Sequence, residues 1–122
     1  MLKINSSRLN ILHVVSGSLS GGAAKGAFWL HKGLNNIGVN SVLLSNRKKE
    51  LHDETVISLA ETFSQKAKFE LLPFIGQSPK YFYRNLQTQQ LFNTGFEGVD
   101  ITKLKAYKSA DIVHLHWING FI

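Results

Sequence analysis

The order of elements at the start of the chain constrains the fold more than any other feature. Residues 9–15 are short, rich in β-branched side chains and almost continuously apolar, as is typical of a central parallel strand that is covered on both faces. Residues 16–22 have the composition of a turn, and a second apolar strand is predicted over residues 39–44. A strand, a glycine loop, a helix and a strand in this order predict a βαβ unit with parallel strands and therefore an α/β fold.

The helix of this unit is expected to begin near Ala23 and to end at Gly38, a residue type that often terminates helices. Its apolar positions are spaced by four and three residues, which places them on one helical face. The predicted buried face consists of Ala23, Ala27, Leu30, Leu34 and Ile37.

The remaining elements are predicted over residues 55–59 (strand), 61–72 (helix), 101–108 (helix) and 110–117 (strand), with an irregular aromatic-rich stretch over 73–98. Asp100 is the expected N-cap of the second of these helices, and Val113 and Leu115 are expected core positions of the last strand. A parallel strand normally leads into a covering helix, and none follows here. We therefore expect residues 1–122 to form one truncated domain. The alternative is a small complete domain whose last strand closes the sheet.

The charge of the chain favours an anionic partner. Lys and Arg outnumber Asp and Glu by 14 to 8, which gives a formal net charge of +6. Nucleic acid, a phospholipid surface and a phosphorylated metabolite are all compatible with this charge. No RNA-recognition or helix-turn-helix signature is present, so a nucleic acid is not the expected partner.

The chain has no cysteine, which excludes a disulfide framework and any thiolate metal site. No apolar run approaches the roughly 18 residues of a membrane span, and the N-terminus lacks the features of a secretory signal. We expect a cytoplasmic protein whose membrane contact, if any, is peripheral, at the inner face of the plasma membrane.

The glycine loop is the first candidate site. Amides at the start of a helix attract phosphate, and glycine lets a ligand approach the backbone. The loop does not contain the dinucleotide fingerprint. Gly17 and Gly22 have the spacing of a phosphate-binding loop, but Ala23 and Ala24 replace its Lys-Ser/Thr pair. An NAD enzyme and a nucleoside triphosphatase are therefore disfavoured. The alternative is a turn that needs glycine only for its backbone dihedral angles.

His114 and His116 are the second candidate site. Residues two apart on a strand point to the same face, and the carboxyl end of a parallel strand is where ligands gather. Acid–base or hydrogen-bonding work on a substrate is therefore plausible for this pair. Two imidazoles are too few to hold a metal, and no other ligand is evident in the sequence. The alternative is a pair satisfied by backbone at the sheet edge. His13 is expected to be structural, and His31 is assigned no role.

Several segments together resemble a known family. Residues 11–15, 21–34 (GGAAKGAFWLHKGL) and 38–41 resemble the start of family-four retaining glycosyltransferases of the GT-B architecture. Residues 110–120 (ADIVHLHWING) are similar to a later strand and turn of the same N-terminal domain, and the region ending at 100–103 looks like the branch of bacterial polysaccharide clusters. These segments bracket nearly the whole chain in the expected order.

The resemblance implies a Rossmann-like three-layer domain, the acceptor-side half of a two-domain enzyme, without its donor-binding domain. It implies that Gly21 and Gly22 approach the diphosphate of a nucleotide sugar and that His116 is the catalytic residue that faces the transferred sugar. The expected substrate-binding residues around it are His114, Trp117 and Asn119. No metal or other cofactor is implied. The family's His-Glu-Pro is replaced after His116 by Trp-Ile-Asn-Gly, so the choice between His114 and His116 stays open.

The leading hypothesis is therefore the acceptor-side domain of a sugar-nucleotide-dependent glycosyltransferase of bacterial surface-polysaccharide synthesis, inactive alone. Its substrates would be a nucleotide sugar and a saccharide or lipid-linked saccharide acceptor. The alternative is a standalone module that docks on anionic lipid or on a partner protein. The first hypothesis requires the glycine turn and the histidine pair to meet at the same edge of one sheet.

Overall fold

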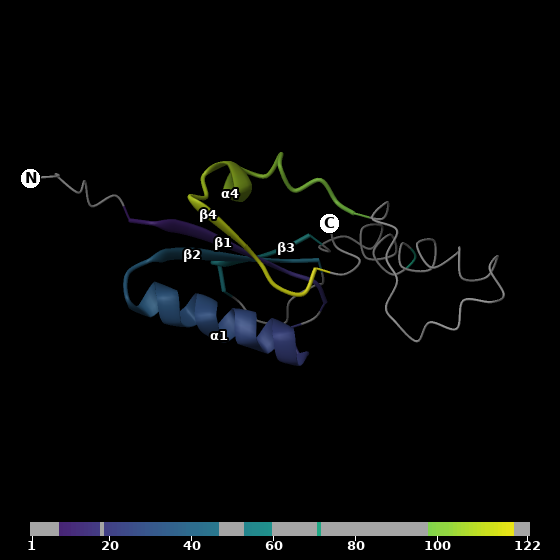
Figure 1. The fold of residues 1–122 in the computed structure, drawn as a ribbon, viewed down its shortest axis with the longest axis horizontal. Coiled ribbons are helices and arrows are strands. Elements are labelled where there is room, and N and C mark those ends of the chain that lie inside the picture. Colours follow the sequence, from purple (N-terminus) through teal and green to yellow (C-terminus); the bar gives the residue numbers. More distant parts are fainter. Residues whose placement is uncertain (1–7, 18, 47–52, 60–70, 72–97, 119–122) are drawn as a thin grey trace, which may run out of the picture.

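Four parallel strands form the sheet at the centre of the structure. The computed structural model describes residues 8–17, 19–46, 53–59, 71 and 98–118 of the 122-residue chain. Within these residues the strand order is β3-β2-β1-β4, and neighbouring strands are parallel. The elements are β1 (Asn10–Val15), α1 (Gly22–Asn36), β2 (Asn40–Ser45), β3 (Val56–Ser58), α4 (Lys105–Lys108) and β4 (Ile112–Leu115) (Figure 1). The predicted α/β fold with its four strands is confirmed. The helix predicted over 61–72 and the aromatic-rich stretch lie outside the described residues, apart from positions 71 and 98.

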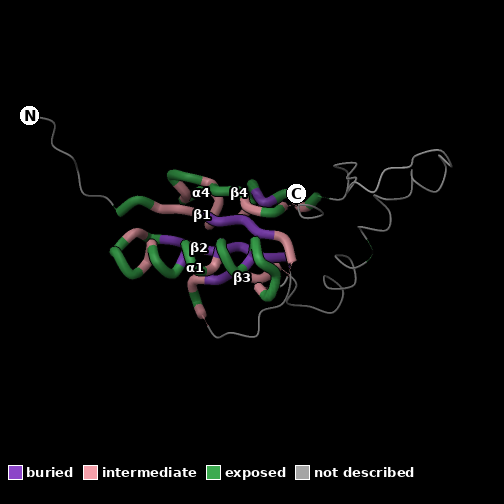
Figure 2. Tube along the Cα trace, turned by 60° about the horizontal axis from the view of Figure 1, so that its bottom comes forward, coloured by how far each residue is buried: buried purple, intermediate pink, exposed green. Residues whose placement is uncertain are grey.

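The centre of the sheet is β1, which lies between β2 and β4. Its register pairs Leu12 with Val42 on one side and with Val113 on the other. Residues 12–15 are all buried, and they form the continuous purple stretch of β1 in Figure 2. Burial on both faces explains why the strand reads as an unbroken apolar run rather than an alternating one.

The two faces of the sheet carry separate apolar clusters. One cluster joins β1 and β2 to the segment that leads into α4, through Leu12, Val14, Leu44 and Ile101. The other cluster joins the opposite faces of the same strands to α1, through Val15, Ala24, Ala27, Leu43 and Val56. The two helices therefore lie on opposite sides of the sheet (Figure 1).

The first helix forms as predicted, but the prediction of its buried face is wrong in part: Ala27 is buried and Leu34 is half-buried, and the other three positions are exposed. The buried residues are Ala24, Ala27 and His31. In contrast, Leu30 is 42% exposed and Ile37 is 76% exposed, and Ala23 is exposed as well. The helix is rotated because His31, a polar residue, occupies a buried position, which an apolar pattern does not reveal. The predicted stop at Gly38 is confirmed by its positive φ of 86°.

The helix predicted over 101–108 is shorter than expected. It begins at Lys105, and Leu104 occupies the N-cap position. Asp100 is not an N-cap but accepts a hydrogen bond from the Thr102 N–H at 3.0 Å. This local turn places Ile101 in the core, at 6% exposure, so the helix starts after it.

The last strand, β4, has β1 as its only partner among the described strands. The strand is shorter than the predicted 110–117 because it pairs with β1 only from Ile112 to Leu115. Val113 is half-buried, but Leu115 is 47% exposed, so the core position predicted for Leu115 is wrong. The side chain sits at the sheet edge, where no described strand lies beyond it.

None of the helices in the described ranges has the length and apolar character that a bilayer crossing requires.

Candidate functional site

The carboxyl ends of β1 and β4 meet at one end of the sheet. The N–H of Ser16, just past β1, donates to the carbonyl of Trp117, just past β4, at 2.6 Å. The N–H of His116 donates to the carbonyl of Val14 at 2.9 Å. The turn after β1 and the histidines of β4 therefore lie at the same end of the sheet, which is the end where open parallel α/β sheets bind ligands.

The end of β2 holds the glycine turn in place. The Gly17 N–H donates to Asn46 Oδ1 at 2.7 Å, and Ser45 Oγ donates to the Gly17 carbonyl at 2.8 Å. Gly17 has a φ of +89°, in the left-handed region that favours glycine. Ser45 and Asn46 are both buried. Sequence reasoning did not single out these two residues, although a polar pair at the end of an apolar strand was the available signal.

Gly21 and Gly22 form the start of α1. Gly21 is the N-cap, in an extended conformation with φ −71°, and Gly22 is the first helical residue. Neither has a positive φ, and a Cβ atom at either position would meet no atom of another described segment within 4 Å. The dihedral-angle explanation of the glycines therefore holds for Gly17 but not for this pair. In the described part of the chain no side chain caps this helix, and its first turn has no acidic residue, so no described group neutralises the positive end of its dipole.

Three histidines gather on the face of the sheet that α1 covers. The strand register places His114 directly opposite His13, and His116 follows two residues later on the same face. The ring centroids of His13 lie 5.3 Å from those of His114 and 5.2 Å from those of His116, and the latter two rings are 4.1 Å apart. His13 is completely buried, His116 is half-buried and His114 is exposed. The cluster thus runs from the core to the surface.

A hydrogen bond joins two of these rings. His13 Nδ1 and His116 Nε2 are 2.9 Å apart, whereas the buried His13 Nε2 has no hydrogen-bond partner among the residues that the structure describes. A buried N–H group without a partner is rarer than an under-used acceptor. The proton of His13 is therefore best placed on Nδ1, from which it donates to His116, and His13 Nε2 keeps a buried lone pair. His116 then carries its own proton on Nδ1.

The pKa of His13 is lowered from its ordinary value of 6.5 to about 4, mainly by burial and then by His116, His114 and His31 in that order of importance. Burial, followed by His114, also lowers the pKa of His116. Near neutral pH the rings of His13 and His116 are therefore uncharged. Uncharged imidazole offers a lone pair to a donor or a metal ion.

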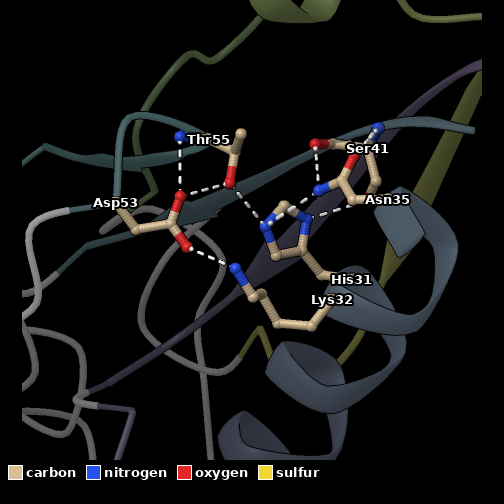
Figure 3. A network of polar contacts seen from close by, with 6 residues as sticks. All are labelled: His31, Lys32, Asn35, Ser41, Asp53 and Thr55. Atoms are coloured by element: carbon tan, nitrogen blue, oxygen red, sulfur yellow. Dashed lines mark hydrogen bonds and ion pairs between the residues drawn. The ribbon is translucent and has the colours of Figure 1, made fainter. Parts of the chain in front are cut away.

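His31 forms a separate polar network, which is shown in Figure 3. Its Nδ1 lies 2.8 Å from Ser41 Oγ, and its Nε2 lies 2.9 Å from Thr55 Oγ1. The Thr55 hydroxyl donates to Asp53 Oδ1, so its oxygen accepts from His31 Nε2–H and Ser41 donates to Nδ1. This network links α1, β2 and the residues before β3, and sequence reasoning assigned His31 no role.

A hollow of about 400 Å³ lies on the opposite face of the sheet, lined in part by Ile101, Tyr107, Val113 and Leu115. Two of its polar side chains, Asp100 and Thr102, are hydrogen-bonded to each other. It contains neither the histidines nor the glycine turn, so it is not part of the candidate site.

The structure thus brings together the predicted residues His114 and His116. Trp117 follows them in the chain, and its carbonyl accepts a hydrogen bond from the Ser16 N–H. Trp117 is 52% exposed. Gly21 and Gly22 lie on the turn that leaves the same end of the sheet. Asn119 lies outside the described residues. His13 was expected to be purely structural. It belongs to the histidine cluster because β1 pairs with β4, and the order of the strands is not evident from the sequence.

Comparison of the chain with protein-family models, with curated proteins and with solved structures found no match.

Proposed function

We propose that the chain is the acceptor-side domain of a sugar-nucleotide-dependent glycosyltransferase, the Rossmann-like N-terminal half of a GT-B enzyme of bacterial surface-polysaccharide synthesis. It would work at the cytoplasmic face of the membrane on a saccharide or lipid-linked saccharide acceptor. A second domain would hold most of the nucleotide-sugar donor, so transfer by residues 1–122 alone is not expected.

One observation carries this proposal. The uncapped start of α1 and the histidine cluster both lie at the carboxyl end of the parallel sheet, and the Ser16–Trp117 hydrogen bond joins the two segments that bear them. Amides at Gly21 and Gly22 would stabilise the negative charge of the departing diphosphate. The open space around both glycines leaves room for a ligand next to the backbone.

His116 would hydrogen-bond the sugar near its anomeric carbon. Its Nε2 is engaged by His13, so Nδ1–H is the donor left for a substrate hydroxyl. His13 is buried and thereby fixes the orientation of the His116 ring. As proposed, the transfer step needs no metal ion. Closure of the two domains would exclude water from the site.

The test is a titration of the chain with UDP-glucose and with GDP-mannose, followed by the amide NMR signals. We expect weak, saturable shifts at residues 21–22 and 114–117. Gly22→Asp places a negative charge where the diphosphate would lie, and it should abolish the shifts. Gly33→Asp is the matched control, because this glycine is also on α1 with open space around it. His116→Gln should remove the preference for the nucleotide sugar over the free nucleotide.

Absence of shifts in the wild-type chain, or equal shifts in Gly22→Asp and Gly33→Asp, would contradict the proposal.

The second candidate function is a module that docks on anionic lipid. It is favoured by the exposed apolar side chains of Ile112, Leu115 and Trp117. Sedimentation with phosphatidylglycerol vesicles and no response to nucleotide sugars would support this second function instead.

A further inference from the structure

A third histidine changes what the histidine pair of β4 is able to bind. In the sequence His13 lies about a hundred residues before His114, and two imidazoles are too few for a metal site. Because β4 pairs with β1, the strand register places His13 opposite His114. One nitrogen from each of His13, His114 and His116 then lies within 4.8 Å of the other two.

We propose that His13, His114 and His116 form a binding site for one divalent transition-metal ion of the zinc class. Three imidazoles are a common protein ligand set for zinc, with water or substrate at the fourth position. The set contains no carboxylate, which disfavours magnesium and calcium, since these ions prefer oxygen ligands. His114 is exposed, so the fourth position would open towards solvent.

The spacing of the nitrogens fits this assignment after small ring movements. Zinc–nitrogen bonds of about 2.0–2.1 Å in a tetrahedral site place ligand nitrogens roughly 3.3 Å apart. His13 Nδ1 and His116 Nε2, the ligand atoms that face each other, are 2.9 Å apart, slightly closer than this. An ion bound between them would replace the proton on His13 Nδ1, and the neutral His13 ring would then carry its proton on Nε2. The ring of His114 is the one that has to approach, and it stands exposed on an edge strand.

The pairing of His13 with other imidazoles is the second sign of a ligand. His13 is completely buried, its Nδ1 faces His116 Nε2, and its Nε2 has no hydrogen-bond partner among the described residues. A structural histidine normally pairs both ring nitrogens, as His31 does with Ser41 and Thr55. The hydrogen bond between His13 and His116 accounts for the position of one nitrogen in each of these two rings. It gives no reason for the third ring, that of the exposed His114, to lie beside them.

This site goes beyond the proposed transferase function, and it shares His116 with it. A bound ion and a sugar hydroxyl would compete for that side chain. Metal binding is therefore measured without any nucleotide sugar, so that failure of one proposal leaves the other testable.

The experiment uses the 122-residue chain without a polyhistidine tag, freed of metal by dialysis against EDTA and then against buffer. Zn²⁺ alone is titrated by calorimetry, and Co²⁺ is added separately to record its visible absorption. We expect one Zn²⁺ per chain and a tetrahedral Co²⁺ spectrum. His114→Gln and His116→Gln should each weaken Zn²⁺ binding at least tenfold and abolish the Co²⁺ spectrum.

Two variants make the result decisive. His114 is exposed, so His114→Gln should fold, and circular dichroism checks this. His52→Gln removes one histidine that lies outside the described residues, and it controls for unspecific binding by histidine number. It should bind Zn²⁺ as the wild type does. The proposal is overturned if the wild type shows no saturable 1:1 binding, or if the His114 and His52 variants bind Zn²⁺ equally well.

Discussion

His31 determines how α1 sits on the sheet, because it is a large polar side chain at a buried helical position. Both of its ring nitrogens have hydroxyl partners, and Asn35 on the next turn of the helix bonds the N–H and carbonyl of Ser41. A buried polar group is tolerated only when it is hydrogen-bonded. The network therefore replaces apolar contacts that the helix would otherwise make with β2, and it fixes the rotation of the helix about its axis.

Replacing His31 by Ala should destabilise the fold by about 2–4 kcal/mol, since it leaves a cavity and removes the partner of Ser41 and Thr55. Lys32→Met is the matched control on the adjacent residue. Lys32 forms an ion pair with Asp53 at 3.2 Å, but its side chain is 47% exposed, so its loss should cost less than about 1 kcal/mol. Urea unfolding of the two variants measures the difference. Equal stabilities would show that the network does not hold α1.

Replacement of Gly17 and of Gly22 by alanine should change the free energy of unfolding differently. Gly17→Ala forces a side chain into a φ of +89°, which should cost about 1–3 kcal/mol. Gly22→Ala meets no steric obstacle and adds a better helix former, so stability should be unchanged or slightly higher. The urea midpoints of both variants test this. If both variants lost stability to the same extent, the role given to Gly22 as a ligand-facing residue without a structural duty would be wrong.

At the scale of elements, the sequence predicted the strands better than the packing of the helices. The short, β-branched and almost continuously apolar run of residues 10–15 is typical of a covered strand, and Gly38 ends α1 as expected. The buried face of α1 was missed because it depends on His31 and its partners, which lie on other elements. The pair His114 and His116 was predicted, but the third ring, His13, was missed for a related reason: its contact with His116 depends on strand order, and local spacing carries no information about strand order.

Asp53, in the segment before β3, forms an ion pair with Lys32 of α1. The contribution of this carboxylate to the stability of the fold should depend on pH. The hydrogen bonds that Thr55 donates lower the pKa of Asp53 well below its ordinary value of 3.8, and Lys32 lowers it further. A carboxyl group whose pKa is lower in the folded state stabilises the fold above its unfolded value and loses this contribution as pH falls. Stability should therefore be constant with respect to Asp53 above pH 5 and should decline below about pH 4.

Urea unfolding between pH 3 and pH 6 checks this expectation, with Asp53→Asn as the test variant. The variant should be less stable than the wild type at pH 6, and the difference should shrink towards pH 3. Asp100→Asn is the control, because Asp100 bonds a threonine in the same way but has an exposed side chain. A difference between the wild type and Asp53→Asn that stays the same at every pH would exclude the proposed linkage.

At the scale of the whole molecule, the sheet order decides which residues carry stability. Leu44, Val14 and Leu115 lie in one row across β2, β1 and β4, since the register pairs Val14 with both of the others. The three side chains share a face of the sheet, yet their burial differs. Leu44 and Val14 are completely buried, whereas Leu115 is 47% exposed. The burial of the side chains in this row therefore decreases from the interior strands β2 and β1 to the edge strand β4.

Leu44→Ala and Leu115→Ala make the same chemical change at two places in this row, so only the position in the sheet differs. Leu44→Ala should cost about 3–5 kcal/mol, because it removes transfer free energy and leaves a cavity in a core that is packed on all sides. Leu115→Ala should cost about 1 kcal/mol, since roughly half of the side chain already contacts water. Urea unfolding of both variants gives the two values. A similar cost at both positions would mean that another part of the molecule covers β4 in solution, and that the exposed edge described for this strand is itself part of a packed interface.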